Sequence, residues 1–301
     1  MLEPQPRIAP KKLRHRKVFA VIPTLLTLCN AACGFGAISI AAKVGPDHFQ
    51  GVELEIAAYL IFLAMLFDAL DGSAARLTNQ TSDFGAQLDS LCDAISFGVA
   101  PAFMMLQLAH RDHHLMNTIT AAPFNLHPRI LWAIAVLFMV CAILRLARFN
   151  VETDEEDSHN FFSGLPSPAA AGVVASFPIA ISKLKEELSV EGAVSWAKPA
   201  ADYLLPSLVI VLPLITLAAA TLMVSRIRYA HLFNQMLRGR RGRKQILQIV
   251  FAMVLVSVVL QMALPVLFLA FAFASPVRAL WERYFFKGKR GIQTAKETKD
   301  I

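Results

Sequence analysis

The sequence predicts an all-α fold, a polytopic membrane bundle of about eight transmembrane helices. Hydrophobic residues make up 56% of the chain, and the mean hydropathy of +0.52 exceeds that of ordinary soluble domains. Long apolar runs recur along the whole length, and roughly 20 such residues suffice to cross a bilayer. Lys and Arg gather in alternate connecting segments, which is typical of a protein that crosses the membrane repeatedly.

Six apolar spans form the predicted membrane core, residues 18–228. The first span follows the basic N-terminal segment 1–17 and is too long for the hydrophobic region of a signal peptide. Each later span ends where charged or turn-forming residues return. The six spans cover approximately residues 18–42, 54–72, 85–109, 129–149, 165–182 and 204–224.

A C-terminal pair of spans, 245–260 and 263–280, is predicted after a basic loop at 229–244, and a basic tail follows at 281–301. Pro265 lies where the two spans meet, so one long kinked helix is an alternative. A single helix would place the basic tail on the side opposite the other basic segments. The charge pattern therefore favours two spans.

The distribution of Lys and Arg also predicts the orientation. With eight spans, 23 of these residues lie on one side of the membrane and six on the other. Cytoplasmic loops are the basic ones, so both termini are expected in the cytoplasm. The net charge of +7 belongs to residues that flank apolar helices, which favours membrane lipids with anionic headgroups as partners. No nucleic-acid-binding motif is present, and no nucleic-acid partner is expected.

Four aspartates lie at or near the ends of two neighbouring spans, where carboxylates are costly and indicate function. Asp68 and Asp71 are three residues apart and share one face of the second span. Asp89 and Asp93 are four residues apart and share a face of the third span. Because the second span runs inward and the third outward, the two pairs are expected to meet at one depth on the cytoplasmic side.

These four carboxylates need compensating positive charge, because like charges at close range repel. Hard divalent cations that prefer oxygen ligands, Mg²⁺ or Mn²⁺, supply it. Two ions would suit four carboxylates and can also hold substrate phosphates. The pattern therefore predicts a metal site formed by Asp68, Asp71, Asp89 and Asp93.

Small and polar residues accompany the aspartates. Gly72 and Ala75 lie on the aspartate face of the second span, and Gly85 lies one turn before the aspartates of the third. Small side chains at these positions leave room for a flat ligand against the backbone. Arg76 can bind a phosphate, and Ser82 is a nearby hydroxyl donor.

The complete pattern reads Asp68-x2-Asp71-Gly72-x2-Ala75-Arg76-x8-Gly85-x3-Asp89-x3-Asp93. At every specified position it resembles the signature of the CDP-alcohol phosphatidyltransferase family. The resemblance implies that the four aspartates bind the metals and that the last one, Asp93, is also the catalytic base. It further implies nucleotide contacts at Gly72, Arg76 and Ser82, and a homodimer.

Further segments resemble the bacterial phosphatidylserine synthase branch of that family. They are PTLLTLCN at 23–30 with CGF at 33–35, SFGVAP at 96–101, LRLARFN at 144–150, FSGLPSPAA at 162–170 and LMVSRI at 222–227. The implied reaction transfers the phosphatidyl group of CDP-diacylglycerol to L-serine and releases CMP. The implied location is the bacterial inner membrane, with the active site facing the cytoplasm.

Residues outside the signature are candidates for substrate contacts. Arg145 and Arg148 end the fourth span on one face, where they either anchor the helix or hold the serine carboxylate or a lipid phosphate. Asn150 and Ser96 are further candidates for the acceptor site. Asn30, a polar residue in the first span, either bonds to a neighbouring helix or contacts the nucleotide.

Two alternatives stay open from the sequence. The same metal chemistry can use another acceptor, namely glycerol 3-phosphate, an inositol phosphate or choline. From another class, a divalent-cation transporter can use the same four carboxylates, although it leaves Gly72, Ala75, Arg76 and Gly85 unexplained. No Ser–His or Cys–His pair suggests a covalent enzyme intermediate, so direct displacement is expected.

Overall fold

The computed structural model describes residues 11–44, 52–78, 83–116, 126–152, 162–189, 197–229, 263–278 and 281. The predicted span 245–260, the basic loop that follows residue 229 and the basic tail after residue 281 lie outside these residues. Side chains are described over a smaller part, which excludes those of residues 11–20 and 75–78.

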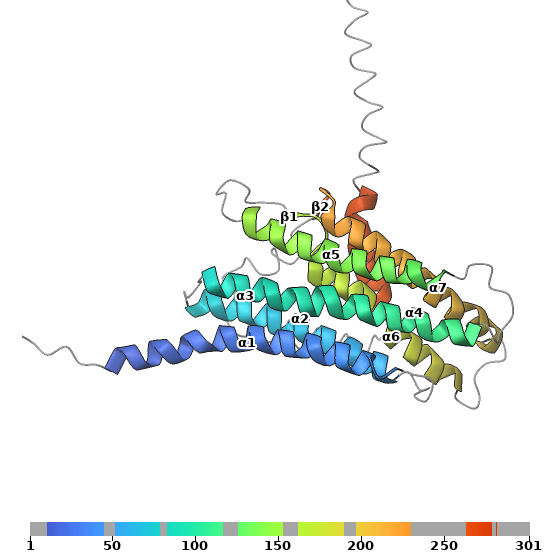
Figure 1. Cartoon of the computed structure of the whole chain (residues 1–301), viewed down its shortest axis with the longest axis horizontal. Helices are drawn as coiled ribbons and strands as arrows, with labels where there is room; N and C mark the ends of the chain where they lie inside the picture. Colours follow the sequence, from blue (N-terminus) through green and yellow to red (C-terminus); the bar gives the residue numbers. More distant parts are fainter. Residues whose placement is uncertain are drawn as a thin grey trace, which may run out of the picture.

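The described chain is a bundle of long helices that run side by side (Figure 1). Helices suit a bilayer because every backbone donor and acceptor is satisfied within the helix itself. A further helix, Ala263–Arg278, follows the labelled elements. In chain order the helices that precede it are α1 (Lys11–Ala41), α2 (Val52–Thr78), α3 (Asp83–Asp93), the π-helix η1 (Ala94–Val99), α4 (Ala100–Met116), α5 (Pro128–Glu152), α6 (Ser167–Ser189) and α7 (Ala197–Val224).

Five stretches of the described helices are long and apolar enough to cross a membrane. α2 is not among the five, and it carries both acidic and basic residues. Apart from two strands of two residues each, the described elements are helices, so the all-α prediction is confirmed for this part of the chain. The count of eight spans is not confirmed. The five stretches are Val21–Ala41, Phe84–His110, Pro128–Val151, Ser167–Glu186 and Ser207–Val224.

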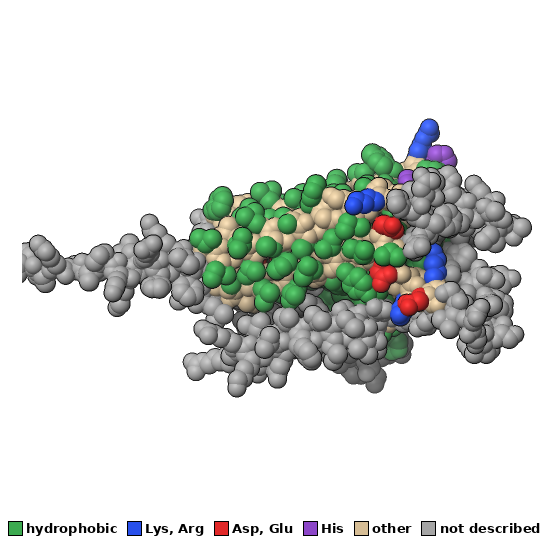
Figure 2. All heavy atoms as spheres, turned by 90° about the horizontal axis from the view of Figure 1, so that it is seen from below, with side chains coloured by type: hydrophobic (Ala, Val, Ile, Leu, Met, Phe, Trp, Pro, Cys, Tyr) green, Lys and Arg blue, Asp and Glu red, His purple; other side chains and the backbone are tan. Residues whose placement is uncertain are grey.

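Hydrophobic side chains cover the outside of the bundle as well as its core. Figure 2 shows a broad band of them on the face in view, with charged side chains gathered toward one end. Phe35 is 68% exposed and Trp132 is 61% exposed. Exposure of such large apolar side chains is unfavourable in water but not in lipid. The band is therefore the lipid-facing surface expected of a membrane bundle.

The core is built around α2, which packs against α1, α4 and α6. Its fully buried residues include Ala57, Ala58, Ile61 and Ala64, which recur at helical spacing on one side. Small residues let neighbouring helices approach closely in a membrane, where packing replaces the hydrophobic effect as the source of stability. This packing holds the aspartate-bearing end of α2 in place.

The π-helix η1 interrupts the long helix that runs from α3 into α4, and it begins directly after Asp93. α1 crosses it at Gly34, where an added Cβ would lie 2.7 Å from the Cα of Ser96. Only a glycine allows so close an approach. The contact brings the segment of α1 around Asn30 against the end of α3.

A short antiparallel ladder ties the start of α6 to the end of α7. In it, β1 (Phe162–Ser163) pairs with β2 (Arg228–Tyr229). The Gly164 amide donates to the Ile227 carbonyl at 2.9 Å, and the Leu165 amide donates to the Leu222 carbonyl at 3.0 Å. Gly164 has φ +88°, in the left-handed region that favours glycine. The ladder sets the position from which Ser167 begins α6.

Gly164→Ala should destabilise the protein. The left-handed backbone alone costs an L-residue about 1–2 kcal/mol, and the new Cβ would collide with the Met223 carbonyl oxygen. Thermal unfolding in detergent should show a lower midpoint than the wild type. Gly36→Ala is the control, because its Cβ would meet only the end of the Leu60 side chain, at 3.3 Å. Equal losses in the two variants would show that stability does not depend on a glycine at this turn.

Candidate metal centre and active site

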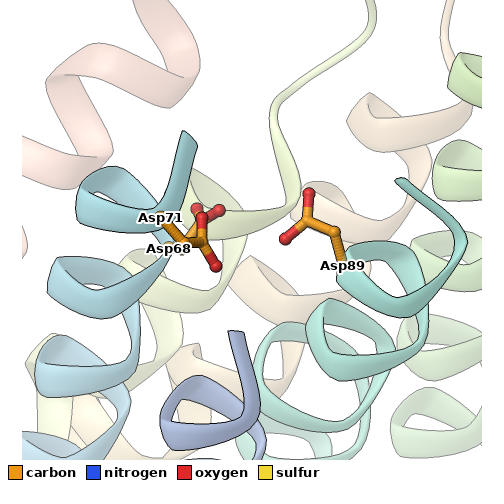
Figure 3. A group of neighbouring side chains, drawn as sticks. All are labelled: Asp68, Asp71 and Asp89. Atoms are coloured by element: carbon orange, nitrogen blue, oxygen red, sulfur yellow. The ribbon is translucent and has the colours of Figure 1, made fainter. Parts of the chain in front are cut away.

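Three carboxylates from two helices converge at one end of the bundle. Asp68 and Asp71 project from α2, three residues apart, and face Asp89 on α3 (Figure 3). One carboxylate oxygen from each residue lies within 4.8 Å of the other two. The helical spacing predicted that each pair shares a face, and α1, which packs against both α2 and α3, brings the two faces together.

The chemistry of this group fits a hard divalent cation. The Oδ2 atom of Asp71 and the Oδ1 atom of Asp89 are buried and have no hydrogen-bond partner among the described residues. A buried carboxylate oxygen without a donor is costly, and three neighbouring carboxylates also repel one another. An oxygen-only donor set is what Mg²⁺ and Mn²⁺ prefer. Asp68, Asp71 and Asp89 are therefore the residues that can hold a metal.

The fourth predicted aspartate, Asp93, lies one turn beyond Asp89 at the end of α3 and is 7% exposed. Its carboxylate is not in the group of three. Its Oδ1 atom accepts a hydrogen bond of 2.9 Å from the Nδ2 of Asn30. Asp93 is close enough to Asp68 and Asp89 to be repelled by both. It belongs to the same acidic centre but has its own hydrogen-bond partner.

α1 supplies two polar residues to this centre. Asn30 is fully buried, and its carbonyl accepts a hydrogen bond of 2.9 Å from the Ser96 hydroxyl. Thr27 is 6% exposed, lies one turn before Asn30 and approaches the Asp71 carboxylate. Asn30 and Ser96, predicted as nucleotide and acceptor contacts, thus bond to each other, and the Asn30 side chain reaches Asp93.

A basic side chain approaches the acidic centre from α5. The Arg145 guanidinium attracts the carboxylates of Asp93 and Asp68. Its Nη1 donates a hydrogen bond of 2.7 Å to the Oγ of Ser167, which is fully buried at the start of α6. Ser167 follows the β1–β2 ladder by a few residues, so the ladder lies close to the hydrogen-bond partner of Arg145.

The end of α5 also contacts α3. The Asn150 Nδ2 donates to the Ser90 Oγ at 2.9 Å, and Ser90 follows Asp89 directly. Arg148, three residues after Arg145, is half-buried on the same side of α5. Three of the predicted acceptor residues therefore lie along one end of α5, the end that contacts α3.

The predicted nucleotide residues are described to different extents. An added Cβ at Gly72 would meet no atom of the described residues within 4 Å, so this part of the structure leaves open space beside the aspartate face of α2. Gly85 lies in the first turn of α3. Ala75 and Arg76 lie in the last turns of α2, where only the backbone is described, and Ser82 lies outside the described residues.

Ser167, Thr27 and Ser90 contact predicted site residues, yet sequence reasoning did not select them. A signal was available for Thr27, which precedes Asn30 by three residues and shares its helix face. Ser167 lies between two prolines in a segment that resembles the family, but nothing in its spacing indicated a bond to Arg145. Side-chain bonds between distant segments are not visible in a local pattern.

The part of the chain that carries this site is similar to known proteins. The CDP-alcohol phosphatidyltransferase family model matches residues 20–201, which include all four aspartates. The chain is 32% identical over 155 residues to a CDP-diacylglycerol--serine O-phosphatidyltransferase of Mycobacterium tuberculosis, covering 50% of this chain and 46% of the relative. It is 34% identical over 154 residues to the enzyme of that name from Helicobacter pylori, covering 51% and 55%.

An archaeal relative is also similar. The archaetidylserine synthase of Methanothermobacter thermautotrophicus is 37% identical over 161 residues, covering 53% of this chain and 58% of the relative. The chain spans about half the length of the curated relatives it matches. The family model nevertheless covers more than half of the chain. With its apolar helices, the chain is an integral membrane protein and belongs to the CDP-alcohol phosphatidyltransferase family.

Proposed function

We propose that this protein transfers the phosphatidyl group of CDP-diacylglycerol to L-serine, giving phosphatidylserine and CMP. The observation that carries the proposal is the convergence of Asp68, Asp71 and Asp89 beside the open space at Gly72. The bacterial and archaeal relatives differ in the lipid that their names specify, but serine is common to all three names. Serine is therefore the favoured acceptor.

The carboxylates of Asp68, Asp71 and Asp89 would hold Mg²⁺ or Mn²⁺, with Asp93 close by. When bound, the metal neutralises the pyrophosphate and the charge that develops on the leaving group. The open space beside Gly72 lies on the aspartate face and suits the approach of the nucleotide to the α2 backbone. Arg76 follows one turn later and is assigned to a phosphate.

The proposed reaction is a direct displacement at the phosphorus that carries diacylglycerol. The serine hydroxyl oxygen forms a new bond to this phosphorus while the bond from phosphorus to the CMP oxygen breaks. Asp93 accepts the hydroxyl proton as the general base. Its buried position beside the other carboxylates suits this role, because the proton relieves part of their mutual repulsion.

The serine carboxylate is assigned to the basic end of α5. Arg145 donates a hydrogen bond to Ser167 and is attracted by the carboxylates of Asp93 and Asp68. Arg148 lies three residues on and shares its face, so this end of α5 carries two cations on one side. A guanidinium binds a carboxylate with two parallel hydrogen bonds. We therefore assign the carboxylate to Arg148, supported by Arg145, with Asn150 at its margin.

We also propose that the active site faces the cytoplasm at a bacterial inner membrane. The distribution of Lys and Arg supports the orientation, and the family resemblance supports the choice of membrane. The substrates enter from two phases under this proposal, the lipid from the bilayer and serine from the cytoplasm. Homodimerisation is proposed on the family resemblance alone.

Asp71→Asn should abolish turnover while the protein still inserts and folds. The substitution removes one negative charge from the centre and hardly changes the helix surface. CMP release by purified enzyme should be lost at every Mg²⁺ or Mn²⁺ concentration. Glu186→Gln is the control, because Glu186 is an exposed carboxylate that pairs with Lys183 on α6. Near-normal activity of Asp71→Asn at saturating metal would overturn the metal assignment.

An acceptor screen tests the proposed function directly. Purified enzyme with CDP-diacylglycerol and Mg²⁺ or Mn²⁺ should release CMP with L-serine and form phosphatidylserine. Ethanolamine, which lacks the carboxylate, should be a poor acceptor. CMP release with glycerol 3-phosphate, an inositol phosphate or choline in place of serine would refute serine as the acceptor. The chemistry of the family would still hold. Metal transport into vesicles without CMP release would favour the transporter.

Arg148→Lys should raise the KM for serine and leave that for CDP-diacylglycerol nearly unchanged. A lysine keeps the charge but cannot form the two parallel hydrogen bonds. Arg129→Lys is the control, because Arg129 lies at the opposite end of the same helix. Steady-state kinetics with each substrate varied in turn separate the two constants. A rise confined to the KM for CDP-diacylglycerol would assign the arginine to the lipid phosphate.

A further inference from the structure

One buried amide bridges the first helix and the end of the third. Asn30 on α1 is fully buried, and its Nδ2 donates to the Oδ1 of Asp93, 63 residues along the chain, at 2.9 Å. Burying an amide in an apolar bundle is unfavourable unless it is hydrogen-bonded. The bond to Asp93 is therefore a main reason why an asparagine is tolerated in this apolar helix.

The chemistry of Asp93 determines how the amide is oriented. In the ionised form that can take up a proton, the Asp93 carboxylate only accepts hydrogen bonds, and the NH₂ group of Asn30 faces it. The Oδ1 atom of Asn30 is consequently left buried, with no hydrogen-bond partner among the described residues. An unsatisfied buried acceptor costs about 1–3 kcal/mol. An amide that served only to join two helices would be expected to satisfy both of its ends.

The backbone of Asn30 is held by the same stretch of chain. The Ser96 hydroxyl, three residues after Asp93 on η1, donates to the Asn30 carbonyl at 2.9 Å. The close approach at Gly34 packs α1 against Ser96 one turn further on. Asp93 and Ser96 thus engage the side chain and the backbone of Asn30, which leaves the amide little freedom to move.

We infer that Asn30 is a positioning residue for Asp93: its amide holds one carboxylate oxygen so that the other faces the acceptor hydroxyl. The inference rests on the proposed function, in which Asp93 accepts the proton. With Oδ1 of Asp93 engaged by Asn30, the proton is assigned to Oδ2. This positioning role differs from the direct nucleotide contact that the sequence left open. A positioning residue changes the rate of transfer, whereas a nucleotide contact changes the affinity for the nucleotide.

The test uses Asn30→Leu and Asn30→Asp in the full-length enzyme with Mg²⁺ or Mn²⁺ and CDP-diacylglycerol. The leucine removes the donor and keeps similar bulk, and the aspartate keeps the shape but replaces the donor by an acceptor. Misplacing a reacting group by about 1 Å costs about 10²-fold in rate, so kcat should fall by about that factor. The KM for CDP-diacylglycerol should stay nearly unchanged. The aspartate variant serves if the leucine variant does not fold.

A double-mutant cycle distinguishes positioning from a purely structural role. If Asn30 acts only through Asp93, adding Asn30→Leu to Asp93→Asn should cost no further activity. Multiplicative losses in the double variant would overturn the inference. Ser176→Ala is the control for a lost buried hydrogen bond, because the bond that the Ser176 hydroxyl makes among the described residues stays within α6, to the Val173 carbonyl. Its kcat should match the wild type, and thermal unfolding should compare the variants' stabilities.

The acceptor in these assays is whichever alcohol the wild-type enzyme uses in the screen. Failure of serine therefore refutes the proposed acceptor without deciding the role of Asn30. Normal kcat in both Asn30 variants overturns the positioning role, whatever the acceptor. A rise in the KM for CDP-diacylglycerol with unchanged kcat overturns the positioning role too, and assigns Asn30 to the nucleotide. A wild type that transfers to no alcohol overturns both proposals.

Discussion

Mutual repulsion among buried carboxylates is the constraint around which this end of the bundle is arranged. Oxygens of Asp68, Asp71 and Asp89 lie within 4.8 Å of one another, and Asp93 adds a fourth acidic group nearby. Two like charges about 4 Å apart repel by about 4 kcal/mol at the effective dielectric near a protein surface. The attraction of Arg145 for two of the aspartates offsets only part of this. A divalent cation and the phosphates it holds would balance the remainder, which links the stability of the site to its proposed substrate.

Two segments outside α2 and α3 support the acidic centre. Only 22% of the apolar stretch Val21–Ala41 of α1 is buried inside the bundle. The buried side of this helix nevertheless carries Asn30 and the close approach at Gly34. Removing such a polar group from water is unfavourable unless it finds a partner, and the partner lies at the end of α3. From the other side, the β1–β2 ladder fastens the start of α6, where Ser167 accepts the bond from Arg145.

Apolar runs and the spacing of the aspartates determined much of this protein from sequence alone, whereas the orientation that the charge asymmetry indicates stays a prediction. A run of apolar residues in a bilayer has few options besides a helix, so the helix positions were predictable from 18–42 to 204–224. Helical periodicity likewise placed Asp68 with Asp71, and Asp89 with Asp93, because neighbours three or four residues apart share a face. The number of membrane spans was not determined, since the charged α2 and the short helix Ala263–Arg278 are not resolved by hydropathy alone.

Tertiary structure decided which side chains meet. It placed Asn30 against Asp93, Ser167 against Arg145 and Ser90 against Asn150, across separations of 63, 22 and 60 residues. Such bonds depend on how helices cross and rotate against one another, and that depends on small residues such as Gly34 and on the π-helix η1. A periodic pattern specifies the face of a helix but not the residue opposite it. The chemical groups of the site were therefore determined by the sequence, and the partner of each polar group came from packing.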